Sequence, residues 1–165
     1  MSQIKVDRWQ FRDGTTVGTA IQTAYSQIVT STTTTTTIPL DDTIPQSTEG
    51  AEFLTVTITP KKIGNVLRVQ AIIFFGLSGN SIGAAALFKN SDASAVAAVA
   101  QVNNTAVSVM TLNYYETITS LTAITFKVRC GPTGAVTFRI NGGTAARVFG
   151  GVTNSSITVQ EIQAG

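Results

Sequence analysis

Hydrophobic and polar residues alternate with a period of two along much of the chain after residue 52. The pattern is clearest at residues 53–59, where Leu54, Val56 and Ile58 alternate with threonines. Successive side chains of a strand point to opposite faces of a sheet, so this alternation predicts a strand with one buried and one solvated face.

A second strand, predicted at residues 66–77, is apolar on both faces in its second half. Ile73 and Phe75 continue the buried set, whereas Ile72 and Phe74 stand at the outward positions. A strand that is apolar on both sides is typically covered on both, either by another layer or by another subunit. We therefore expect Ile72 and Phe74 to lie at an interface with another subunit of a symmetric assembly.

Strand and turn signals continue to the end of the chain. Further strands are predicted at residues 84–89, 93–100, 106–116, 124–130, 136–140, 147–152 and 155–162, with turn signals such as Asn90-Ser91-Asp92 and Asn141-Gly142-Gly143 between them. Alanine alone would favour helix at residues 84–100. The regular succession of strands favours sheet there, so the sequence predicts an all-β fold, an antiparallel jelly-roll-like β-sandwich with an extended N-terminal arm.

The predicted arm, residues 1–37, is more polar than the predicted domain, residues 38–165. Its apolar residues near the start stand among charges and either clasp the body or anchor the arm in a partner; they are Ile4, Val6, Trp9 and Phe11. Residues 17–28 fit either a short helix or an extended segment, because apolar residues recur at spacings of three and four among many threonines. Thr32 to Thr37 favour extended backbone but offer no apolar face, so this threonine tract needs a partner to become ordered.

Composition limits the classes of partner. The 165 residues allow one domain with an arm, and only 12% of them are charged, about half the usual share of roughly 25%. A weakly charged surface suggests contact with other protein. The net charge of +2 without a dense basic cluster predicts no nucleic-acid partner. No segment approaches the roughly 20 apolar residues of a membrane span, so we expect no membrane association and synthesis in the cytoplasm.

Candidate chemistry is sparse. The chain has no histidine and one cysteine, which removes the common metal-ligand sets and the nucleophile-base pairs that use histidine. We therefore expect no enzyme activity, catalytic residue, metal or cofactor. Cys130 lies in phase with Phe126 and Val128, which predicts a buried, inert thiol. Lys127 and Arg129 are expected to share an outer face with Arg139.

Several segments together resemble a module of tailed-bacteriophage virion proteins. They are Ile38-Pro-Leu-Asp-Asp-Thr-Ile-Pro-Gln-Ser-Thr-Glu-Gly-Ala-Glu-Phe53, Ile58-Thr-Pro-Lys61, Ala86-Leu-Phe-Lys-Asn90, Thr125-Phe-Lys-Val-Arg129, Phe149-Gly-Gly-Val152 and Ser155-Ser-Ile-Thr-Val-Gln-Glu-Ile162. The likeness covers residues 38–162 and is to the jelly-roll module of capsid-decorating proteins and tail-fibre tips. It implies a non-enzymatic homotrimer on a virus particle, and it carries over no active-site residues.

Three functions follow as alternatives. A capsid decoration, or cement, protein would bind the major capsid protein or another virion protein through its arm. A receptor-binding tail-fibre or spike tip would carry its ligand site on the domain. A free-standing module is the third. The arm favours decoration, because fibre subunits usually present a long coiled-coil stem and this sequence has no heptads.

Overall fold

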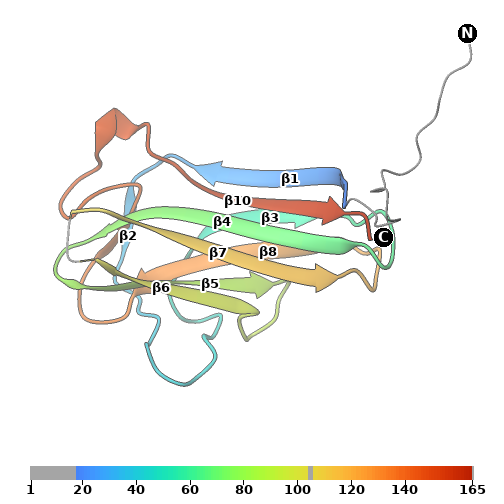
Figure 1. Ribbon diagram of the computed structural model, residues 1–165. Coiled ribbons are helices and arrows are strands. Elements are labelled where there is room, and N and C mark those ends of the chain that lie inside the picture. The colour runs from blue at the N-terminus through green and yellow to red at the C-terminus, as the bar shows by residue number, and fades with distance from the viewer. Residues whose placement is uncertain (1–17, 104–105, 165) are drawn as a thin grey trace, which may run out of the picture.

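The chain folds into two antiparallel sheets that pack face to face (Figure 1). The computed structural model describes residues 18–103 and 106–164. Their strands are β1 (Ala20–Ile28), β2 (Thr32–Thr34), β3 (Ala51–Ile58), β4 (Val66–Leu77), β5 (Ser81–Lys89), β6 (Ala97–Asn103), β7 (Ser108–Thr117), β8 (Ile124–Pro132), β9 (Phe138–Ile140) and β10 (Ser155–Ile162), with a 3₁₀ turn, η1 (Phe149–Gly151), before β10. The all-β prediction is confirmed.

The six-stranded sheet is built around β4. On one side β4 pairs with β10, which pairs with β1, and on the other side it pairs with β7. Beyond the end of β10, β9 takes its place along β4, and β2 pairs with β9. The second sheet has the order β3–β8–β5–β6. The orders β1–β10–β4–β7 in one sheet and β3–β8–β5–β6 in the other are the strand orders of a jelly-roll sandwich, as the sequence predicts.

The core lies between the sheets and follows the predicted alternation. Leu67, Val69, Ala71, Ile73 and Phe75 of β4 are fully buried, and they face Phe126, Val128 and Cys130 of β8 in the same core cluster. The Phe75 and Phe138 rings stack with their centroids 5.0 Å apart. The burial of Cys130 confirms its predicted register, and burial raises the pKa of this thiol far above its ordinary value.

The adjacent tyrosines of β7 point to opposite faces, as their spacing requires. Tyr114 packs against Phe126 inside the sandwich, and Tyr115 is 57% exposed outside it. Burial, and then the nearby Glu116 carboxylate, raises the pKa of Tyr114, so this phenol stays neutral.

One segment has two predicted alternatives, and another departs from its prediction. Of the helix and the extended segment predicted at residues 17–28, the structure has the extended one: from residue 20 it is the strand β1, which pairs on one side with β10. The predicted strand at 147–152 is a loop with η1, in which Phe149, Gly150 and Gly151 all have positive φ. Backbone in this left-handed region cannot continue a strand.

The threonine tract is ordered by its own chain. Thr32, Thr33 and Thr34 pair with Ile140, Arg139 and Phe138 as β2. The first three residues of the tract therefore have a pairing partner, β9, within the same chain. The predicted boundary between arm and domain at residue 37 is therefore not a boundary of the sheet, because residues 20–34 supply two of its strands.

Candidate functional site

The four arm residues proposed as an anchor, Ile4, Val6, Trp9 and Phe11, lie outside the described residues. The two proposed interface residues lie on the outer side of β4. Ile72 is 43% exposed and Phe74 is half-buried, while their neighbours Ile73 and Phe75 point into the core. The structure therefore places Ile72 and Phe74 together on one surface, on the face of the six-stranded sheet that points away from the core.

This surface, called here the open face, is formed by the outward side chains of β1, β10, β4 and β7. The strand register aligns them in rows such as Tyr25, Thr158, Gln70 and Asn113 across the four strands. Next to Ile72 and Phe74 lies Val109 of β7, which pairs with Phe74 and is 49% exposed. The open face thus carries a strip of exposed apolar side chains within a field of neutral polar ones.

Charge is nearly absent from the open face. Arg68 is the one charged residue among the outward positions of these four strands in the described part of the chain, and its Nε atom has no hydrogen-bond partner there. A second arginine, Arg139 of β9, stands at an outward position at the end of the same sheet. The acidic residues of the same strands are turned elsewhere. Glu116 makes a 2.7 Å ion pair with Lys89 of the other sheet, and Glu161 is buried. Depletion of charge at the centre of a surface patch is typical of protein interfaces.

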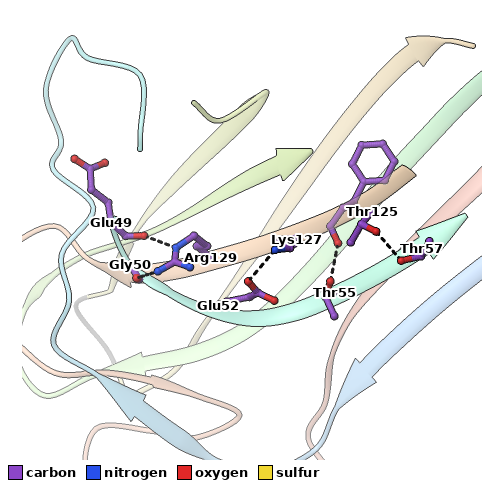
Figure 2. A network of polar contacts seen from close by, with 9 residues as sticks. Glu49, Gly50, Glu52, Thr55, Thr57, Thr125, Lys127 and Arg129 are labelled. Carbon is purple, nitrogen blue, oxygen red and sulfur yellow. Dashed lines mark hydrogen bonds and ion pairs between the residues drawn. The ribbon is translucent and has the colours of Figure 1, made fainter. Parts of the chain in front are cut away.

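Along β3 and β8, the outer face of the four-stranded sheet is polar, and its side chains bond to one another or to nearby backbone (Figure 2). The Thr57 and Thr125 hydroxyls lie 2.8 Å apart, and Lys127 Nζ lies 3.8 Å from a Glu52 carboxylate oxygen. Arg129 donates from Nε to the Glu49 carbonyl and from Nη2 to the Gly50 carbonyl, both at 2.7 Å. We call this row the polar ladder. Arg139 does not join it, contrary to prediction, because β9 belongs to the other sheet.

Part of this second face is covered by the chain itself. Ile38, which is 2% exposed, packs with Ala84, Ala86 and Phe88 of β5 in a small separate cluster. The Ile38 amide donates to the Pro132 carbonyl at 3.0 Å, which fixes the start of the loop 38–50. Ala84 and Ala86 belong to the alanine-rich segment for which a helix was considered, and they are the small side chains over which this loop packs.

Asn141 organises the end of the sandwich where β1 gives way to β2. Its backbone has φ +53, a left-handed conformation that asparagine tolerates better than most residues. Its buried side chain donates from Nδ2 to the Ile28 carbonyl at 2.7 Å and accepts from the Ser155 hydroxyl at 2.8 Å. Ser155 Oγ in turn accepts from the Phe74 amide at 3.0 Å. The side chain thus joins the end of β1 to β10 and β4.

Glu161 organises the opposite end. Its carboxylate is buried and accepts hydrogen bonds from Gln22 Nε2 of β1, from the Lys61 and Lys62 amides, and from Asn65 Nδ2, at 2.5, 2.8, 3.1 and 2.7 Å. Burial alone would raise the pKa of Glu161, but these four donors outweigh it and hold the pKa below its ordinary value. An ionised carboxylate therefore ties β1 and the β3–β4 loop to β10.

The loop before β10 exposes two apolar side chains. Phe149 is 71% and Val152 is 77% exposed, and Figure 1 shows η1 projecting from one end of the sandwich, beyond β1 and β10. Phe149 also has φ +51. A bulky residue in this conformation is strained, and such positions are enriched at functional sites.

Sequence reasoning missed Asn141 and Glu161 as organising residues. The Asn-Gly-Gly signal marked Asn141 as part of a turn, but its burial depends on residues more than 100 positions away. Glu161 lies in phase with the buried residues Ile157 and Val159, and a charged residue within a buried set was the available signal.

Among the described residues, no three histidine, cysteine, aspartate or glutamate side chains gather as metal ligands do, and no helix is long and apolar enough to cross a bilayer. The chain matches no known family model, and no curated protein shows significant similarity to it.

Proposed function

We propose that this chain is a non-enzymatic structural protein of a bacteriophage virion, a homotrimeric capsid decoration protein held to the major capsid protein or another virion protein by its N-terminal arm. The observation that carries the proposal is the open face, an almost uncharged sheet surface on which Ile72, Phe74 and Val109 form an apolar strip at one end. The jelly-roll topology and the resemblance of residues 38–162 to virion modules support it.

The chemistry of the titratable groups supports a binding role. Cys130 is buried with a raised pKa, and Glu161 is ionised and fully hydrogen bonded. Neither group is available as a nucleophile or as a general acid at neutral pH. What the described surface offers instead is area for contact with protein, of the kind that symmetric assembly commonly covers.

The test of the assembly is the mass of the full chain in solution. Light scattering at micromolar concentration should give three times the chain mass. Ile72→Lys should dissociate the assembly, because a lysine would be buried without a partner. Thr57→Lys, on the exposed part of the polar ladder, is the matched control and should leave the mass unchanged. A monomer mass for the wild-type chain would refute the trimer.

The test of the anchor uses Trp9, since truncating a buried aromatic costs about 3–5 kcal/mol. Trp9→Ala should keep the trimer but fail to sediment with capsids that lack the protein. Sedimentation at wild-type occupancy would refute the anchor.

One observation favours the tail-fibre tip as a second candidate. Phe149 and Val152 project from one end of the sandwich, where a distal loop would meet a receptor. If Phe149→Ser abolishes attachment of virus particles to host cells without reducing the occupancy of the protein on the particle, the tip function is the better assignment.

A further inference from the structure

The strand β6 leaves one edge of the four-stranded sheet open. β6 pairs with β5 on one side, and among the described residues no strand pairs with its other side. Its residues Ala97–Asn103 include neither a charge nor a proline, and Ala98, Ala100 and Val102 are exposed. The Val102 carbonyl already accepts from the Gln101 and Ser108 side chains at 3.2 and 3.5 Å. Residues 97–101 therefore form the open stretch.

Open edges are usually protected, because unpaired N–H and C=O groups invite another strand. The edge strand β1 has a register irregularity between Ala20 and Gln22, and the edge strand β3 has one between Glu52 and Leu54. β3 also carries the ion pair of Glu52 with Lys127. Residues 97–101 have neither kind of protection, so this edge is suited to accept a strand.

The chain itself begins such a pairing just before β6. The Ser47 amide donates to the Ala93 carbonyl at 2.7 Å, and the Ala95 amide donates to the Pro45 carbonyl at 2.9 Å. The next amide, that of Val96, donates to Leu87 of β5 at 2.8 Å. Consecutive amides of an extended chain point to opposite sides, so residues 45–47 lie on the side away from β5. An added strand would continue along the line of residues 45–47.

The added strand would end at a shallow, widely open hollow with acidic residues along one wall. Residues 41–45 and 95–98 line a volume of about 400 Å³. The wall holds Asp41 and Asp42, which are exposed, and Ile44, which is 60% exposed. Asp41 accepts from the Thr43 hydroxyl at 2.5 Å and from the Thr43 amide at 2.9 Å, and these bonds lower the pKa of Asp41. The hollow therefore presents fixed negative charge at neutral pH.

We propose that the open edge of β6 binds an extended segment of a partner protein as an added strand, with a lysine or arginine of that segment beside Asp41 and Asp42. Backbone pairing with residues 97–101 supplies the affinity, since strand addition needs no particular side chains. The carboxylates of Asp41 and Asp42 make the site specific for segments with a positive charge at the matching position. This site is separate from the open face and goes beyond the virion role, because it does not depend on trimer formation or on the arm.

The test uses the full chain and a synthetic peptide, acetyl-Lys-Val-Thr-Val-Thr-Lys-amide, followed by two-dimensional N–H NMR spectra. The peptide should shift the amide signals of residues 97–101, with little change on β3. The matched peptide with glutamate in place of both lysines should bind more weakly, by up to about fivefold for each exposed charge contact that it loses. Replacing the second valine, the fourth residue of the peptide, by proline should abolish binding, because proline cannot donate to a ladder.

Variants of the protein separate the two parts of the site. Asp41→Asn with Asp42→Asn should remove the preference for the lysine peptide, whereas Glu52→Gln, an exposed acid at the other edge of the sheet, should not. Unchanged β6 signals with every peptide, or equal binding of the proline peptide, would overturn the proposal. So would β6 signals that shift with protein concentration alone, which would assign the edge to a second copy. Particle binding and the trimer mass test the virion role separately.

Discussion

On the outside of the four-stranded sheet, Ile38 and Ala95 of the same chain bury Phe88 to 2% exposure, whereas on the outside of the six-stranded sheet Ile72 stays 43% exposed. Both positions are apolar residues that point away from the main core. The difference is that residues 38–50 return over β5, while no described segment crosses β4 beside Ile72. Among the described residues, one apolar outer surface is therefore covered by a loop of its own chain, and the other stays exposed.

Charge distinguishes the two faces in the same way. The polar ladder holds Lys127 and Arg129 and satisfies them with Glu52 and with the carbonyls of Glu49 and Gly50 (Figure 2). The open face holds Arg68, whose Nε lacks a partner among the described residues. A face that meets water can carry charge at little cost, whereas a face that is to be buried loses stability for every unpaired charge. We therefore expect substitutions on the face covered by the chain itself to change the stability of the single chain, and substitutions on the open face to change assembly.

The largest effect should come from Phe88→Ala. It removes a nearly fully buried ring from the loop-covered face, so the free energy of unfolding should fall by about 3–5 kcal/mol. Urea titration monitored by circular dichroism measures the fall, which should not depend on protein concentration. Phe74→Ala on the open face is the matched comparison. Its effect should grow with protein concentration if that face is an interface, because only the assembled protein then buries the ring. If Phe88→Ala and Phe74→Ala lost the same free energy of unfolding at every protein concentration, the two faces would not differ in the way described.

Asn141→Ala should follow, with a loss of about 2–4 kcal/mol. The substitution leaves the Ile28 carbonyl and the Ser155 hydroxyl without their partner and puts a side chain other than asparagine at φ +53. Asn141→Gly separates the two causes, since glycine adopts positive φ freely but makes no side-chain hydrogen bond. The glycine variant should be the more stable of the two. If both variants matched the wild type in thermal unfolding, the open-face sheet would not depend on this link between β1 and β10.

Glu161→Gln should cost about 1–3 kcal/mol at pH 7, because two backbone amides and two side-chain amides lose a charged acceptor. The pKa of Glu161 is lowered in the folded state, so its stabilisation is complete above the ordinary glutamate pKa of about 4.3 and is lost as the pH falls through the folded value. The wild type and the variant should therefore converge in acid. A constant difference between their denaturation midpoints from pH 7 to pH 3 would contradict this account.

Local pattern was enough to predict the sheet but not its connections. The alternation at residues 53–59 and 66–77 predicted β3 and β4, and the phase of Cys130 with Phe126 predicted its burial, because each depends on neighbours in sequence. The outcome at residues 17–28 depended on pairing with β10 at the far end of the chain. The missed loop at residues 147–152 depended on positive φ at Phe149, which no hydrophobic pattern encodes.

The same distinction between local pattern and distant pairing applies to the candidate sites. Ile72 and Phe74 were predicted to be outward because strand periodicity sets direction, and the structure places them there. The hollow beside Asp41 and Asp42 could not be predicted, because it forms only where the loop meets residues 95–98. The sequence pattern therefore predicted which side chains lie on the open face, but it did not predict the site at the edge of β6.

The smallest effect on stability should come from breaking the Glu52–Lys127 ion pair of the polar ladder. This pair is compared with Arg68, which has no ion-pair partner among the described residues. Glu52 and Lys127 are both more than a third exposed and 3.8 Å apart, a setting in which ion pairs contribute roughly 0.2–1 kcal/mol. A double-mutant cycle with Glu52→Ala and Lys127→Ala should give a coupling energy within that range, and 0.5 M salt should reduce it because water and ions screen exposed charges. Arg68→Gln provides the contrast: if the open face is the proposed subunit interface, removing an unpaired charge from it should strengthen assembly. The readout is the concentration at which light scattering shows dissociation. Weaker assembly of Arg68→Gln would mean that Arg68 meets an acceptor on the partner, and that the open face is not selected for the absence of charge.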